Sequence, residues 1–164
     1  MKYWRMAMRW GKNGEDFFPA CKQRGIAALD YYWGEGLKER IVEDCRKLTV
    51  DEYKRIWQLR APKNPSGKYS MLRLWKEMKV GDIIYAKTGP EIVGKGTITG
   101  EYEYNPDILK DTKAFRWGHF VRVNWEKEFV KFIFKFDATP WSTIQELIGP
   151  ELQRLLDAER ASGT

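Results

Sequence analysis

A change of hydrophobic period near residue 82 is the strongest constraint on how this 164-residue chain can fold. From that point apolar and polar residues alternate through four runs, which are separated by Gly, Pro, Asn or charged residues. Alternation with period 2 is typical of β-strands that bury one face. We therefore expect strands at 82–87, 92–99, 115–125 and 129–136, with a tight turn at 126–128 between the last two.

Upstream of residue 82, strand and helix spacings follow one another. Residues 2–10 alternate as in a strand, whereas Thr49 with Glu52 matches the capping box that begins a helix. The other expected elements are a helix at 15–24, a strand at 26–29, a turn at 30–33, helices at 37–48 and 71–78, a loop at 61–67 and a closing helix capped by Ser142 with Gln145. Together these predict one α+β domain over 1–160, with 161–164 as a linker.

Residues 89–96 read G-P-E-I-V-G-K-G, which differs from the phosphate-binding Walker A loop only at the last position. That loop requires Ser or Thr after the Lys, and it opens a helix. Here Gly96 follows Lys95, and the continuation TITGEYEY is β-patterned. We therefore expect a β-hairpin, with a tight turn at 89–90 and with Gly94 and Gly96 at bulges or close backbone approaches.

The charge of the chain is mildly basic, with 29 Lys and Arg against 23 Asp and Glu and a formal net charge of +6. Residues 54–87 carry most of the excess. A basic region of this kind suits a polyanion, although helical lysines commonly form only a solvated face. The residues expected to contact a nucleic-acid backbone are Arg60, Lys63, Lys68, Lys87 and Lys95.

Sequence signals for a membrane, a leader peptide or a metal are weak. No apolar run approaches the ~20 residues of a membrane span, and the start MKYWRMAMRW is too polar for a signal peptide. Cys21 and Cys45 have no CxxC partner, so neither a zinc site nor a disulfide framework is indicated. We expect a soluble cytoplasmic protein that uses no cofactor or metal and does not bind a membrane.

Aromatic residues gather at the ends of the expected strands. Residues 30–33 read D-Y-Y-W, and residues 115–119 read F-R-W-G-H where the long strand begins. Aromatic faces can stack on a planar ring while neighbouring polar groups contact its edge. Simple packing is the alternative, because Trp117 and His119 share a strand face with Trp125, which we assign to the core. The candidate pocket residues are Trp10, Asp30, Tyr31, Tyr32, Trp33, Trp117 and His119.

Signatures of catalysis are sparse. His119 is the single histidine, and no G-x-S-x-G or H-E-x-x-H motif is present. Adjacent carboxylates fall in expected helices, where a solvated face is the simpler interpretation. We therefore expect a binding domain and not an enzyme.

Several stretches resemble the PUA-like group of domains, which includes the EVE and YTH domains. They are KYWRMAM, GIAALDYYW, LWKEMKVGDIIYAKTGPEIVGKGTITGEYEY and HFVRVNW. The steps K-x-G-D-x-[IV] at 79–84 and G-x-G-x-I-x-G at 94–100 mark this superfamily. Within it the chain, over about residues 2–148, most resembles the N-terminal DNA-recognition domain of archaeal McrB proteins, the GTP-driven subunits of modification-dependent restriction systems.

This resemblance implies a strongly bent β-barrel flanked by helices, with a pocket at one end that holds a modified base flipped out of a DNA duplex. It places cage residues in the turn at 30–33. YTH readers carry a Trp two residues after a glycine that corresponds to Gly25. This chain has Ala27 at that position, so Tyr32 or Trp33 would have to form the cage wall that the Trp provides. An aromatic cage binds a methyl group on an exocyclic amine favourably, and Asp30 could accept a hydrogen bond from the remaining N–H of that amine. That combination favours 6-methyladenine over 5-methylcytosine.

The resemblance also implies partners, namely a GTPase motor domain in the same full-length chain and a separate nuclease subunit. Three alternatives remain open at the level of sequence. The first is a reader of modified RNA. The second is a small-molecule or nucleotide-processing enzyme with His119 and Asp30 as acid and base. The third is a protein-interaction module.

Overall fold

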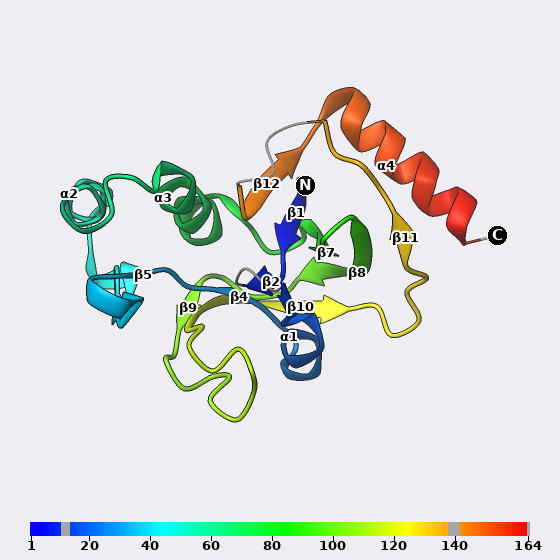
Figure 1. The fold of residues 1–164 in the computed structure, drawn as a ribbon. Helices are drawn as coiled ribbons and strands as arrows, with labels where there is room; N and C mark the ends of the chain where they lie inside the picture. Colours follow the sequence, from blue (N-terminus) through cyan, green and yellow to red (C-terminus); the bar gives the residue numbers. More distant parts are fainter. Residues whose placement is uncertain (11–13, 138–141, 164) are drawn as a thin grey trace.

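The computed structural model describes residues 1–10, 14–137 and 142–163, which form a mixed α+β fold around a strongly curled sheet (Figure 1). The strands of the sheet follow the order β12-β1-β7-β8-β10-β4, with β11 beside β8 and β9 beside β10. β1 runs parallel to β7, whereas the other neighbours in the sheet are antiparallel. The sheet curls into a half-barrel.

The strands of this sheet are β1 (Tyr3–Ala7), β4 (Ile26–Leu29), β7 (Ile83–Thr88), β8 (Glu91–Ile98), β9 (Glu103–Tyr104), β10 (His119–Trp125), β11 (Phe132–Ile133) and β12 (Ile144–Leu147). Two small hairpins stand apart from it and are formed by β2 (Arg9–Trp10) with β3 (Glu15–Asp16) and by β5 (Tyr32–Trp33) with β6 (Glu39–Arg40). The β5–β6 hairpin continues directly from β4, at one end of the sheet.

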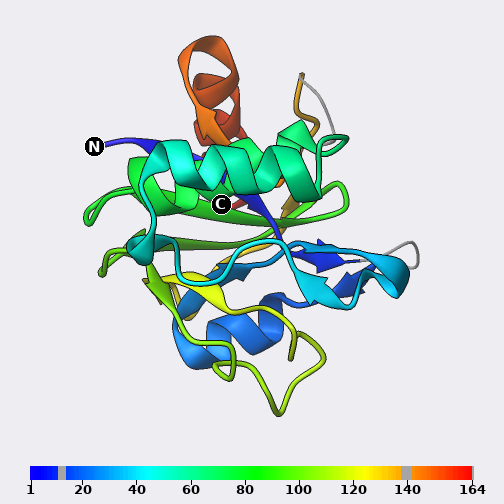
Figure 2. The same cartoon turned by 90° about the vertical axis from the view of Figure 1, so that its left-hand side faces the viewer.

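Helices cover both sides of the sheet. They are α1 (Phe18–Arg24), α2 (Val50–Arg60), α3 (Pro65–Leu72), which a π-helical turn (Arg73–Glu77) extends, and α4 (Gly149–Ser162), with 3-10 turns η1 (Glu35–Leu37) and η2 (Cys45–Lys47). α3 and α4 lie above the sheet and α1 lies below it in both views (Figures 1 and 2). The main core includes Trp4, Ile84 and Phe120, and α4 covers a second cluster around Tyr85 and Leu155.

The glycines at 89–96 belong to the β7–β8 hairpin, as predicted. Gly89 forms its turn with a φ of 59°, and a register shift between Ala86 and Lys87 lies opposite Gly94. At Gly96 an added Cβ would lie 2.5 Å from Val123 Cγ1 and 2.9 Å from the backbone carbonyl oxygen of Asn124. Close packing against β10 therefore requires glycine here, and no helix follows the Lys as a Walker loop would need.

We expect Gly96→Ala to lower the free energy of unfolding by about 1–3 kcal/mol, because the new methyl group overpacks the contact between β8 and β10. Gly163→Ala is the matched control, since its added Cβ would meet only ordinary contacts at 3.6 Å and beyond. Urea unfolding of both variants measures the difference. An unchanged midpoint for Gly96→Ala would contradict the close-packing explanation.

The expected helix at 37–48 is wrong. Leu37, the first residue of the expected helix, has a left-handed φ of 50° that a right-handed helix does not allow, and residues 39–40 and 45–47 form a strand and a short 3-10 turn instead. The chain instead forms the β5–β6 hairpin, so the expected turn at 30–33 is also corrected: its second half is strand β5. The helical spacing of the apolar residues in this stretch does not correspond to a helix.

The expected helix beginning at Ser142 is wrong as well. Residues 144–147 form β12, which pairs with β1, and Gln145 Oε1 accepts a hydrogen bond of 2.6 Å from Arg5 Nη2. The helix begins only after this strand, at Gly149, with Pro150 in the first turn of α4. α4 continues to Ser162, so part of the expected linker is helical.

Smaller shifts affect four other boundaries. The helix expected at 15–24 begins only at Phe18, where Asp16 Oδ1 accepts from the backbone N–H. Pro65 starts α3 inside the expected loop. The strand expected from 115 begins at His119, and the strand at 129–136 shortens to β11. By contrast, β4 and both hydrogen bonds of the Thr49–Glu52 capping box are confirmed.

Of the helices that lie within the described ranges, none is long and apolar enough to cross a membrane.

Candidate functional site

A buried ion pair fixes the base of the β5–β6 hairpin. Asp30 follows β4 and is fully covered, and its Oδ2 accepts from Arg40 Nε at 2.7 Å. The same carboxylate accepts from the backbone N–H groups of Gly118 and Tyr31, each at 3.0 Å. Burial raises the pKa of Asp30 to about 7, and the Arg40 guanidinium with the two N–H groups opposes that rise. Asp30 therefore joins three segments of the chain, and it lines neither the smaller nor the larger cavity beside the hairpin.

Arg40 extends this network to the tyrosines. Its Nη1 donates to Tyr104 Oη and its Nη2 donates to Tyr32 Oη, both at 3.0 Å. Nη2 also donates to the carbonyl oxygen of Arg116 at 2.9 Å, and Tyr32 Oη donates to the same oxygen. The hairpin is thus hydrogen-bonded to the segment that leads into β10.

His119 occupies a closed position between β4 and β9. Its Nε2 lies 3.0 Å from the carbonyl oxygen of Val42, which can only accept, so Nε2 carries the proton. Nδ1 then accepts from Tyr102 Oη at 2.7 Å, while that hydroxyl accepts from the backbone N–H of Cys45 at 3.0 Å. Every polar atom of the ring is paired. His119 is fully buried and supports the hairpin and β10 from within the core.

We expect the ring of His119 to stay neutral from pH 8 to pH 5, because burial lowers its pKa to about 3. The chain has one histidine, so the ring-nitrogen resonances in a long-range ¹H–¹⁵N spectrum are unambiguous. The spectrum should report the Nε2–H tautomer throughout. A titration midpoint near the ordinary value of ~6.5 would contradict this placement and would favour His119 as an acid or base.

An aromatic pocket of about 290 Å³ opens beside this network. Its lining residues are Glu15, Phe17, Tyr32, Lys113, Ala114, Phe115, Arg116 and Trp117. Phe17 and Trp117 form the inner wall, both almost fully buried and in edge-to-face contact at 4.8 Å between ring centroids. Tyr32 is half-buried and Phe115 is 55 % exposed. We call this cavity the aromatic pocket.

Charged groups surround the opening of the aromatic pocket. The Arg116 guanidinium carbon lies 3.8 Å from the centroid of the Tyr32 ring, a stacked cation–π contact. Glu15 is exposed and offers a carboxylate acceptor, and Lys113 adds a second cation. Trp10 pairs with Glu15 through the backbone of β2 and β3, while its side chain lies outside the described residues. The pocket therefore combines apolar faces with both hydrogen-bond acceptors and donors.

Trp33 lies on a different cavity. Strand β5 directs Tyr32 into the aromatic pocket, whereas Trp33 lines a larger hollow of about 720 Å³ between the hairpin and α2. Arg60 stacks over Trp33 at 5.2 Å and donates to the carbonyl oxygen of Ile41. Tyr31 contacts Trp57 edge to face at 5.5 Å and donates to Thr143 Oγ1, so it packs the structure together. Tyr32 and Trp33, which were expected to form one cage, therefore line two different cavities.

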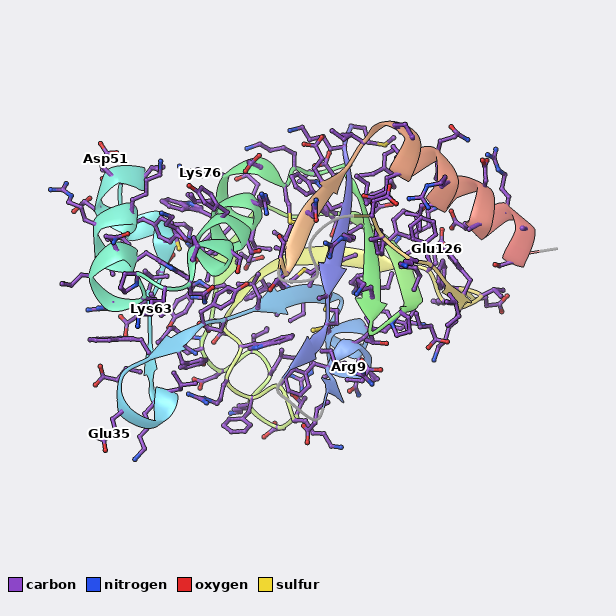
Figure 3. The ribbon with its side chains drawn as sticks, turned by 45° about the horizontal axis from the view of Figure 1, so that its top comes forward. Arg9, Glu35, Asp51, Lys63, Lys76 and Glu126 are labelled. Carbon is purple, nitrogen blue, oxygen red and sulfur yellow. The ribbon has the colours of Figure 1, made fainter. Side chains whose placement is uncertain are left out.

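The five basic residues do not form one surface. Arg60 and Lys63 lie at the end of α2 and beyond it, and Figure 3 places Lys63 on the side of the β5–β6 hairpin. Lys68 belongs to α3, and Lys87 belongs to β7, where its carbonyl oxygen accepts from the N–H of Met8. Lys95 lies beside Glu126 on the opposite side of the molecule and forms an ion pair of 3.2 Å with Glu159.

Sequence reasoning missed Phe17, Arg40 and Phe115 as site residues and did not select Arg116. Phe115 and Arg116 belong to the F-R-W-G-H stretch already singled out, and that clustering was the available signal. Phe17 precedes α1 and reads as an ordinary core residue. Arg40 fell in the wrongly expected helix, so its pairing with Asp30 across the hairpin could not be foreseen.

A family model described as a domain of unknown function (DUF8426) matches residues 4–136. The chain belongs to the DUF8426 family. The matched span includes the whole lining of the aromatic pocket and the Asp30 network, whereas β12 and α4 lie beyond it. No curated protein matches this DUF8426 chain at a significant level.

Proposed function

We propose that this DUF8426 chain is a DNA-binding specificity domain that holds a methylated base, flipped out of the duplex, in the aromatic pocket. The observation that carries the proposal is the convergence of Phe17, Tyr32, Phe115 and Trp117 on one small cavity. A flipped base loses its stacking in the duplex, and aromatic walls replace it at about 1–3 kcal/mol per base. A cavity of about 290 Å³ has room for one planar base.

The chemistry of the pocket supports 6-methyladenine as the favoured base. A methyl group on the exocyclic amine adds apolar surface that aromatic rings can cover. The remaining N–H needs an acceptor, and Glu15 provides one at the pocket, whereas Asp30 is fully occupied by its own donors. Glu15 thus takes the role that the sequence assigned to Asp30.

Basic groups support contact with the phosphate backbone. Lys113 and Arg116 line the aromatic pocket, Arg60 lines the larger cavity beside the hairpin, and Figure 3 places Lys63 on the same side of the molecule. Lys95 is paired with Glu159 on the side of the molecule opposite to Lys63, so it does not belong to this basic surface. Phosphate contacts position a protein on DNA without reading its sequence, so these residues contribute affinity and salt dependence.

The fold is consistent with this function. The curled sheet, the helices on both of its sides and the pocket beside β4 and β10 support a PUA-like architecture of the EVE and YTH kind. By the same resemblance, the domain would act in a modification-dependent restriction system of the McrB type. The GTPase motor and the nuclease would then reside outside these residues, and the chain itself would be non-catalytic.

The test is fluorescence anisotropy with matched short duplexes that differ in one base: adenine, 6-methyladenine, cytosine or 5-methylcytosine. Single-stranded RNA carrying 6-methyladenine is included, and two salt concentrations are used. We expect a preference of at least about tenfold, ~1.4 kcal/mol, for the duplex with 6-methyladenine. Stronger binding to RNA would transfer the proposal to an RNA reader, and equal, weak binding to every probe would overturn both.

A further inference from the structure

A flipped base leaves a gap in the duplex stack. Proteins that unstack DNA frequently insert an apolar side chain such as Leu, Phe, Ile, Met or Pro at that step. A protein that uses the aromatic pocket in this way needs such a side chain beside the pocket. Two exposed apolar residues qualify by their contacts: Phe115 lines the pocket itself, and Leu37 is hydrogen-bonded to Arg116, another lining residue.

Leu37 stands at the tip of the β5–β6 hairpin with its side chain 52 % exposed. It is the one non-glycine residue with a positive φ, 50°, in the part of the chain that the structure describes. A bulky residue in this region is strained, and such strain is typical of functional sites when the surroundings hold it in place. A tip with glycine at this position would avoid the strain.

The backbone of the tip is hydrogen-bonded to a residue that lines the aromatic pocket. The carbonyl oxygen of Leu37 accepts from Arg116 Nη2, and its N–H donates to the carbonyl oxygen of Gly34 at 3.0 Å. Arg116 in turn stacks on Tyr32, so one side chain connects the tip to the pocket wall. Figure 3 shows neighbouring Glu35 at the outer edge of the molecule, pointing away from the body. The tip therefore projects outward while remaining fixed to the pocket.

We propose that Leu37 is the wedge that enters the DNA stack and fills the gap left by the flipped base. This inference rests on the proposed function and adds to it the residue that keeps the target base outside the duplex. In the complex Leu37 would contact the bases on either side of the methylated base. A single strand offers no paired stack, so the contribution of Leu37 is confined to duplex DNA.

The test compares Leu37→Gly with the unaltered chain on two probes, a duplex with one 6-methyladenine and the same methylated strand alone. Glycine removes the side chain and adopts a positive φ without strain, so the melting temperature of the protein should not fall. We expect affinity for the duplex to drop by about tenfold and affinity for the single strand to stay within about twofold. Leu37→Met, which keeps the apolar volume, should restore most of the duplex affinity.

Glu35→Ala is the matched control, because it removes a neighbouring exposed side chain from the same tip and should change both affinities by the same factor. Equal losses on both probes for Leu37→Gly, or no loss on either, would overturn the wedge while the preference of the unaltered chain for methylated duplex survives. Absence of that preference in the unaltered chain would overturn the proposed function and the wedge with it.

Discussion

Asp30→Ala is expected to lower the free energy of unfolding by about 3–5 kcal/mol, which is a large fraction of the stability of an ordinary domain. The substitution leaves the Arg40 guanidinium, only 17 % exposed, without its carboxylate. It also leaves the backbone N–H groups of Gly118 and Tyr31 without their acceptor. Removing one partner of a buried pair is costly because the remaining charge stays away from water.

The control for this prediction is Glu103→Ala. Glu103 pairs with Arg122 at 2.9 Å, but both side chains are at least one third exposed. Such surface pairs contribute about 0–1 kcal/mol. Thermal and urea unfolding of both variants measure the contrast. If both variants lose a similar, small amount of unfolding free energy, the Asp30 carboxylate does not stabilise the contact between the hairpin and the segment before β10.

Phe115→Ala is expected to weaken binding of the methylated duplex by about 1–3 kcal/mol, or roughly 5- to 150-fold in Kd. Phe115 is 55 % exposed, so the truncation removes a wall of the aromatic pocket with little loss of core packing. Trp117 is a poorer probe because it is 4 % exposed and packs against Phe17. Binding titrations with methylated and unmethylated duplex separate loss of base recognition from general weakening.

Ile133→Ala serves as the matched control for Phe115→Ala. Ile133 is an exposed apolar residue on β11, which lies beside α4 on the other side of the molecule (Figure 1). It should leave both affinities unchanged. If Phe115→Ala also changes neither affinity by more than about twofold, the aromatic pocket does not hold the base.

Several elements could be read from the sequence because local chemistry alone determines them. The capping box of Thr49 with Glu52 requires only residues of one turn, and both of its hydrogen bonds are present. The alternation correctly predicted β7 and β8 as strands, although both of their faces are buried: Ile84 lies in the main core, whereas Tyr85 lies in the second cluster that α4 covers. The glycine pattern between the two strands fits a hairpin. Such signals do not depend on what the rest of the chain does.

The hairpin at the site could not be read in this way. The apolar spacing between Leu37 and Leu48 imitates a helix, and nothing local reveals that three left-handed residues at 34, 36 and 37 and a buried Asp30–Arg40 pair will override it. The burial of Asp30 and His119 is likewise a tertiary property. The residue types of Asp30 and His119 suggested that both bind a ligand or act as acid and base. In the fold both are buried and hydrogen-bonded inside the protein.

The aromatic pocket was predicted only in part. Tyr32 and Trp117 were selected because aromatic clusters in connections are poor core material, and both line the cavity. Trp33 was selected on the same argument but faces away, because adjacent residues of a strand point to opposite sides. Had residues 32–33 been identified as a strand, this division would have been predictable.

We expect the methyl group of the flipped base to lie against Phe115 and Trp117, and NMR of a ¹³C-labelled methyl group can detect this contact. The label is placed on one 6-methyladenine in a short duplex, which is then titrated with the chain. The methyl proton resonance should move upfield through ring currents and show contacts to protons of both aromatic rings. Binding without an upfield shift, or contacts to Trp33 and Ile56 in the larger cavity, would contradict the claim.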